Sequence, residues 1–119
     1  PDAMVLRYPV ISAGEFAHLG SFKNLLGNPI PPDLQELMSL EKRVKADTPP
    51  AFLWHTAADA GVPVENSLLF VRGLREHKIP FEMHIYPEGR HGLGLAPDDP
   101  HVATWMSLCG GFFRTLGWR

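Results

Sequence analysis

The chain has 119 residues, 45% of them hydrophobic, so a single globular domain with a buried core is the expected organisation. Its formal net charge of -2, with no Lys or Arg cluster along one face, argues against nucleic acid and an anionic membrane surface as partners. No apolar run approaches the length of about 20 residues that spans a bilayer. The single cysteine, Cys109, excludes a disulfide framework and a thiolate zinc site, and it leaves the compartment undecided.

The beginning of the chain predicts one strand and a short helix. Residues 3–8 (AMVLRY) form a nearly continuous apolar run, which is typical of a strand in a parallel sheet. Residues 12–28 carry a mixed, weakly helical signal that glycines interrupt, so we expect an irregular connection there. Pro31 and Pro32 then precede residues 33–38, a predicted short helix with proline at its start.

Two further apolar runs predict the remaining strands. Residues 51–56 (AFLWHT) are predicted as the central strand, and residues 81–86 (FEMHIY) as a strand with one wetter face near a sheet edge. Between them Pro63 opens a helix whose apolar stripe is predicted to contain Val64, Leu68, Val71 and Leu74, and Leu69 and Phe70 widen it. A last helix is signalled by Asp98-Asp99-Pro100. This alternation of strands and helices predicts the α/β class, with a parallel sheet and right-handed crossovers.

Polar residues follow two of the predicted strands, at the sheet edge where ligands bind in open parallel sheets. Asp59 lies in a turn of small residues after the central strand, and His91 lies among glycines after the next one. Taken singly, Asp59 can instead be a helix cap and His91 can simply hold its loop. Together they favour an acid and a base, because a carboxylate that accepts the Nδ1 proton leaves Nε2 of the imidazole free to remove another.

Two long segments resemble a known family. Residues 48–70 (TPPAFLWHTAADAGVPVENSLLF) and 79–96 (IPFEMHIYPEGRHGLGLA) are similar to the closing segments of acetyl-esterase and acetyl-xylan-esterase-like members of the α/β-hydrolase superfamily, as are YPVIS at 8–12 and GSFKNLLG at 20–27. Such proteins close a Ser-His-Asp triad with an Asp in a pattern like HT-x-x-D-x-x-VP and a His in G-x-HG. The resemblance implies these roles for Asp59 and His91. Related sequences often read TADD where this chain has TAAD at 56–59, and the spacing to Val62-Pro63 favours Asp59 as the acid.

The nucleophile of that family, a Ser in a G-x-S-x-G elbow, has no match in the chain. Ser12 is the only serine at a strand end, whereas Ser67 and Ser107 lie in predicted helices, where solvated or back-bonded hydroxyls are usual. The other serines are Ser21 and Ser39. Cys109, on the apolar face of the last helix, is interpreted as a small core residue. The oxyanion hole, which upstream loops build, is expected to be missing as well.

The remaining histidines are interpreted as structural. His55 falls inside a predicted buried strand, His77 ends a helix where a cation suits the dipole, and His84 faces the wetter side of its strand. No pair of histidines has metal-ligand spacing with a carboxylate. We therefore expect neither a metal nor a cofactor.

Two functions remain open at this stage. The first is a carboxylic-ester hydrolase acting on small acyl esters such as acetyl esters, with acetylated sugars as candidates. The second is a non-catalytic or degenerate α/β-hydrolase fragment that serves as a structural or interaction module. In either case we expect residues 1–119 to be the C-terminal segment of a longer α/β-hydrolase domain and to be inactive alone, because acid and base lack a nucleophile.

The predicted strand at residues 3–8 leads to an expectation about binding partners. In the family fold it pairs with a strand that this chain does not contain, which leaves an apolar open edge. The expected partner is the missing N-terminal half, or a second copy of the chain paired through Ala3 to Tyr8.

Overall fold

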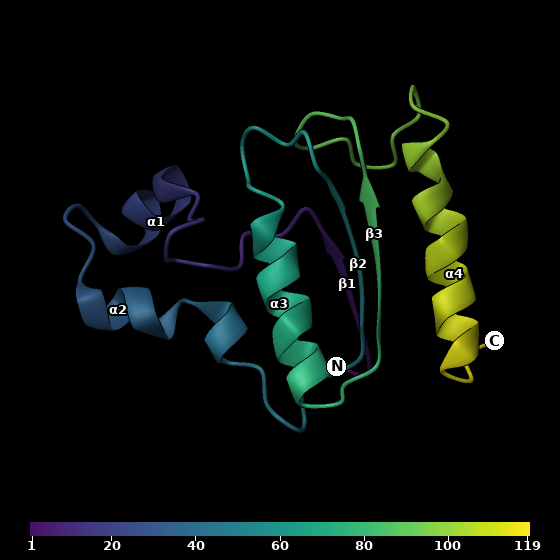
Figure 1. Ribbon diagram of the computed structural model, residues 1–119, viewed down its shortest axis with the longest axis horizontal. Helices are drawn as coiled ribbons and strands as arrows, with labels where there is room; N and C mark the ends of the chain where they lie inside the picture. Colours follow the sequence, from purple (N-terminus) through teal and green to yellow (C-terminus); the bar gives the residue numbers. More distant parts are fainter.

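A computed structural model describes all residues, 1–119, and has three parallel strands packed between helices (Figure 1). The strands follow the order β1-β2-β3 across the sheet, with β1 at Met4–Arg7, β2 at Ala51–Thr56 and β3 at Phe81–Tyr86. The helices are α1 (Leu19–Leu26), α2 (Pro32–Leu37), α3 (Glu65–Glu76) and α4 (Trp105–Thr115), and the 3-10 turns are η1 (Leu40–Lys42) and η2 (Val102–Thr104). The predicted α/β class and central strand are confirmed.

The sheet separates two apolar clusters because successive side chains of β2 point to opposite faces. Ala51 and Leu53 belong to the cluster under α3, while Phe52 and Trp54 belong to the cluster under α4. Figure 1 shows α3 and α4 on opposite sides of the strands. Every residue of β2 is buried, as expected for a strand covered on both faces.

The connection between β1 and β2 is more ordered than the sequence indicated. Residues 19–26 form α1, an eight-residue helix whose first turn is capped by the His18 side chain, which accepts the backbone N–H of Ser21. The prediction of an irregular connection over residues 12–28 is therefore wrong for this part. The helix is short and lies between Gly14 and Gly27, so its apolar periodicity was too brief to stand out.

The predicted apolar stripe of α3 is partly wrong. Val71 and Leu74 are buried as expected, but Leu68 is 41% exposed and Val64 is the residue that precedes the helix. Phe70 is buried as predicted, but because the helix begins at Glu65, its buried face also contains the polar residues Asn66 and Ser67. The two polar residues of this face lead into the functional site.

Asn66 ties the loop after β1 to the start of α3. Its side-chain Oδ1 accepts the backbone N–H groups of Ile11 and Ser12 at 3.0 and 2.9 Å, and its Nδ2 donates to the carbonyls of Phe16 and Pro63 at 2.8 and 3.0 Å. Asn66 is fully buried, so these bonds satisfy both polar atoms of its side chain, which water cannot reach. The loop after β1 is thereby fixed against the same turn that carries Asp59.

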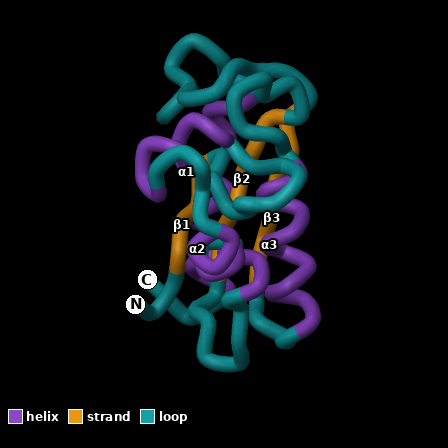
Figure 2. The backbone as a smooth tube through the Cα atoms, turned by 90° about the vertical axis from the view of Figure 1, so that its left-hand side faces the viewer, coloured by secondary structure: helices purple, strands orange, loops and turns teal.

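The strand register places the candidate residues at one end of the sheet. Thr56 and Tyr86, the last residues of β2 and β3, are direct partners in the ladder, so the loops that follow them emerge side by side. Figure 2, seen from the side of α1 and α2, shows these loops at the top and both chain termini at the bottom. No helix combines the length and the apolar character needed to cross a bilayer.

Candidate active site

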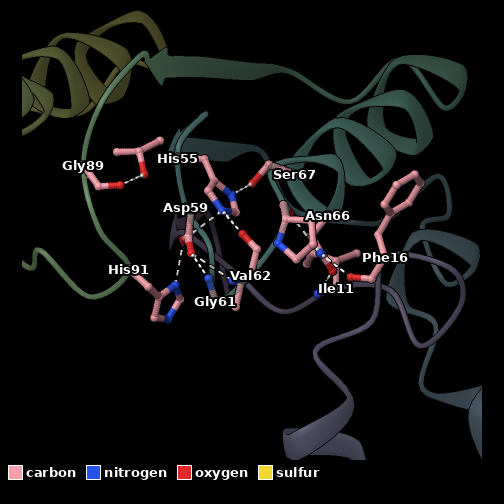
Figure 3. Close-up of polar contacts among 12 residues, drawn as sticks. Ile11, Phe16, His55, Asp59, Gly61, Val62, Asn66, Ser67, Gly89 and His91 are labelled. Carbon is pink, nitrogen blue, oxygen red and sulfur yellow. Dashed lines mark hydrogen bonds and ion pairs between the residues drawn. The ribbon is translucent and has the colours of Figure 1, made fainter.

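The turn after β2 holds Asp59 in a defined orientation. Its carboxylate Oδ1 accepts the backbone N–H groups of Gly61 and Val62, each at 2.9 Å. Its side chain is fully buried, with 0% of its surface exposed. The turn therefore supplies one carboxylate oxygen with two donors and leaves Oδ2 to face the neighbouring loop (Figure 3).

Asp59 and His91 meet across the two strand ends. Nδ1 of His91 lies 2.7 Å from Oδ2 of Asp59, a distance typical of a short hydrogen bond to a charged acceptor. Because a carboxylate accepts, the imidazole Nδ1–H donates and Nε2 stays available. The His91 side chain is 40% exposed, so that Nε2 has room to meet another group.

The pKa of Asp59 is held below its ordinary value. Burial alone would raise it, but the hydrogen bonds from Val62 N–H, from the His91 side chain and from Gly61 N–H stabilise the charged form more strongly. The acid is therefore an anion at neutral pH, as a group that orients an imidazole must be.

Residues from β1 and β2 hold the His91 loop in place. Thr56 Oγ1 donates to the carbonyl of Gly89 at 2.8 Å, and the ring of Tyr8, just after β1, packs edge-on against His91 with 4.8 Å between the ring centroids. Gly89 has a φ of +135°, and a Cβ there would approach Leu93 and Thr56 to 2.8 Å. Only glycine fits this bend, which directs the chain back toward Asp59.

His55 is a site residue that the sequence reasoning missed. It is fully buried on β2, and its Nε2 lies 2.9 Å from the carbonyl of Val62 and 3.3 Å from Oδ2 of Asp59. Its Nδ1 lies 2.8 Å from Oγ of Ser67 on α3. The sequence did contain one signal for His55, namely that it lies four residues before Asp59. The two side chains can meet only because the chain turns back after Thr56.

The other candidate groups lie apart from this pair. Ser12 is buried and donates to Glu41 at 2.9 Å, so it is committed to a structural bond. Ser67 is buried against His55 and is neither solvated nor back-bonded, contrary to the expectation for a helical serine.

Cys109 is buried in the cluster under α4, as predicted, and burial raises the pKa of its thiol. His84 bonds to Glu82 on β3, and His77 bonds to the carbonyl of Gly73 at the end of α3.

An open hollow of about 400 Å³ adjoins the His91 loop. It is lined by Arg90, Leu93, Ala96, Pro97, Asp98 and Asp99. No group of three or more histidine, cysteine or acidic side chains has a geometry that could hold a metal ion.

The model of the prolyl oligopeptidase family matches residues 16–107, which is most of the chain. The chain belongs to this family. The matched range includes Asp59, His91 and the loops that hold them.

Esterases and xylan-degrading enzymes are among the similar proteins. The chain is 51% identical over 100 residues to endo-1,4-beta-xylanase B of Butyrivibrio fibrisolvens, covering 83% of this chain and 16% of that protein. It is 31% identical over 122 residues to the acetylxylan esterase of Xylanibacter ruminicola, covering 98% of this chain and 24% of that protein. The chain therefore spans about a quarter or less of these relatives.

Solved structures with this fold agree. The acetyl ester-xyloside bifunctional hydrolase of Caldicellulosiruptor lactoaceticus is 54% identical with a TM-score of 0.96, covering 99% of this chain and 43% of that one. The carboxylesterase Cest-2923 of Lactobacillus plantarum is 27% identical with a TM-score of 0.76, covering 98% of this chain and 45% of that one. The resemblance to esterase-like α/β-hydrolases is thus confirmed for this member of the prolyl oligopeptidase family.

Proposed function

We propose that the protein to which this chain belongs is a carboxylic-ester hydrolase in which Asp59 orients His91 as the general base. The observation that carries the proposal is the 2.7 Å contact between Nδ1 of His91 and the buried carboxylate of Asp59, at the sheet edge where α/β proteins bind ligands. Similarity to an acetylxylan esterase and to a carboxylesterase supports the reaction class.

The proposed mechanism uses a serine that lies outside these 119 residues. Nε2 of His91 removes the proton of the serine hydroxyl as its oxygen bonds to the carbonyl carbon of the ester. Asp59 stabilises the resulting imidazolium through Nδ1–H. Nε2–H then protonates the departing alcohol oxygen as the carbon–oxygen bond breaks, and a water molecule releases the acid from the acyl-enzyme by the same steps.

Small acyl esters, above all acetyl esters on sugars, are the proposed substrates. Two similar proteins are described by their names as acting on acetyl esters of xylan or on an acetyl ester and a xyloside. The hollow beside the His91 loop is lined by apolar residues such as Leu93 and by the charged Arg90 and Asp98, which suits the flat face and the hydroxyl groups of a sugar ring.

Substitution of His91 and Asp59 in the complete protein tests the proposal. We expect His91→Ala to lower kcat for p-nitrophenyl acetate by about 10⁴-fold or more, and Asp59→Asn by about 10⁴-fold, because the wrong tautomer of His91 then prevails. Acetylated xylose should show the same losses. His84→Ala is the matched control, since this histidine bonds only to Glu82 on β3 and should leave turnover unchanged.

Full activity of a folded His91→Ala protein would rule out the proposal. The competing function, a non-catalytic module with a degenerate site, predicts that the complete protein has no turnover and no serine elbow upstream. The absence of a G-x-S-x-G motif from this chain is the observation that keeps this alternative open. For the isolated 119 residues, we propose that hydrolysis is absent.

A further inference from the structure

His55 makes the most unusual polar contacts in the core. Its ring is fully buried on the central strand, yet both ring nitrogens have partners, Ser67 on α3 and Val62 in the turn after β2 (Figure 3). Because water cannot reach this ring, protein groups satisfy both of its nitrogens. The ring thus connects a helix, a strand and the turn that carries Asp59.

The partners fix which nitrogen of His55 carries the hydrogen. A carbonyl oxygen can only accept, so Nε2–H donates to Val62 and Nδ1 of the neutral ring accepts the hydroxyl hydrogen of Ser67. Burial lowers the pKa of His55, and the Val62 carbonyl and Asp59 offset this only in part. The ring is therefore neutral and held in one tautomer.

Val62 links this ring to the acid. Its carbonyl accepts from His55 while its N–H donates to Oδ1 of Asp59, so one residue fixes both side chains. The Nε2 atom of His55 also lies 3.3 Å from Oδ2 of Asp59, the oxygen that receives Nδ1–H of His91. Two imidazoles, one on β2 and one in the loop after β3, thus face a single carboxylate oxygen.

We propose that His55, oriented by Ser67, is a positioning residue that fixes the carboxylate of Asp59 for His91. It acts through the Val62 carbonyl and through Oδ2 of Asp59, and touches neither the substrate nor the nucleophile. This inference rests on the proposed function for its kinetic consequence. The geometry of the Asp59–His91 pair, however, can be measured without any turnover.

The test compares His55→Leu with His55→Gln in the complete protein. Leucine fills a similar volume without polar atoms, whereas the glutamine amide can donate to the Val62 carbonyl and accept from Ser67. The readouts are kcat and KM for p-nitrophenyl acetate and the proton NMR signal of His91 Nδ1–H, which a short bond to a carboxylate shifts far downfield. His84→Gln is the control, because its ring bonds only to Glu82.

The expected result is a split between kcat and KM. For His55→Leu, kcat falls by about 10- to 100-fold, the loss expected when a hydrogen bond to a charged group is disturbed, while KM changes by less than about twofold. The His91 Nδ1–H signal weakens or moves upfield. His55→Gln restores most of kcat and the signal, and His84→Gln changes neither.

A folded His55→Leu protein with the wild-type kcat and an unmoved His91 signal would overturn the proposal. The same holds if His55→Gln is as impaired as His55→Leu, since a purely space-filling role predicts no rescue by an amide. If His55→Leu does not fold, Ser67→Ala decides. We expect a loss in kcat of about threefold or more and a moved signal, because Nδ1 loses its only donor. Wild-type values for Ser67→Ala would refute the role.

Failure of the proposed function would look different. If the wild-type protein hydrolyses no ester, or His91→Ala retains full activity, the esterase assignment fails, while the NMR comparison of the His55 variants still reports whether Asp59 is positioned.

Discussion

At the scale of single residues, the site is a buried anion surrounded by fixed donors. Asp59 receives two backbone N–H groups on one oxygen and the His91 ring on the other, and its side chain has no exposed surface. A buried carboxylate without such partners would be protonated or would destabilise the fold. The three donors explain how the protein keeps a buried negative charge next to His91.

Because the ring of His55 is buried and neutral, we expect the free energy of unfolding to depend on pH. Its pKa is lowered from 6.5 in the folded state, so below pH 6.5 the unfolded chain binds a proton that the folded chain does not. The free energy of unfolding should therefore fall as pH drops from 6.5 toward the folded pKa, with a slope of up to about 1.4 kcal/mol per pH unit from this group. Urea unfolding at a series of pH values measures it.

The control for this experiment is His55→Gln, which keeps the hydrogen bonds but cannot titrate. We expect its stability to depend less on pH between 6.5 and 5 than that of the wild type. Parallel curves for the two proteins would show that His55 does not contribute to the slope.

Individual residues were predictable to different degrees. Asp59 and His91 were predicted as candidates because each follows a strand end and matches a spaced motif, and the structure brings their side chains together. His55 was missed because a histidine inside an apolar run is usually a core residue, and residues four apart on a strand lie far apart unless the chain reverses. The reversal depends on Gly61 and Val62 bonding to Asp59, which no periodicity reveals.

At the scale of elements, the strands and their register position the site. The sequence predicted residues 51–56 and 81–86 as strands, and the structure has these bounds, because a proline precedes each run and Pro87 ends the second one. The sequence did not predict α1, because a helix of eight residues shows its apolar periodicity only briefly. It also did not predict the whole buried face of α3, because polar residues in the core interrupt the apolar pattern.

Because α3 packs closely against the segment around η1, we expect alanine substitutions at two helix glycines to change stability in opposite directions. A Cβ on Gly73 would lie 3.0 Å from Val44 Cγ2 and 3.2 Å from the backbone oxygen of Glu41, whereas one on Gly110 in α4 would meet only the end of the Arg114 side chain at 3.6 Å. We expect Gly73→Ala to destabilise by about 1–3 kcal/mol despite the better helix propensity of alanine.

Gly110→Ala is the matched variant, and we expect it to stabilise by about 0.5–1 kcal/mol, because it gains propensity without a clash. Chemical unfolding followed by circular dichroism measures both. Equal stabilisation by the two substitutions would show that α3 can move away from Val44. Gly73 therefore marks a close approach of α3 to the segment around η1.

At the scale of the whole molecule, the sheet has two clusters of apolar residues and two open edges. β2 is central, so β1 and β3 each have one side without a strand partner. Val5 on β1 and Ile85 on β3 are 42% and 41% exposed. An unpaired, partly apolar strand edge is a template for pairing with another strand.

We propose that β1 is the edge that pairs, either with the N-terminal half of the protein or with a second copy of the chain. For the isolated 119 residues, we expect dimers or larger species in size-exclusion chromatography with light scattering. Val5→Lys should shift them toward monomer, because a charged edge residue opposes strand pairing. Ile85→Lys on the β3 edge is the control and should leave association unchanged. A monodisperse wild-type monomer would be incompatible with the proposal.

Asp59, His91 and the residues that hydrogen-bond to Asp59 all lie between Ala51 and His91, in one β2–α3–β3 unit and the loop that follows it. The hydrogen bonds that hold this pair together therefore come from one βαβ crossover and the loop after it, and the ring of Tyr8 adds a contact from outside. Under the proposed function, we expect that segments outside residues 51–91, apart from the one that carries Tyr8, can be exchanged to accept a bulkier acyl group or another alcohol without disturbing the contact between Asp59 and His91. Engineering of this protein should accordingly leave residues 51–91 intact and graft diversity onto the surrounding loops.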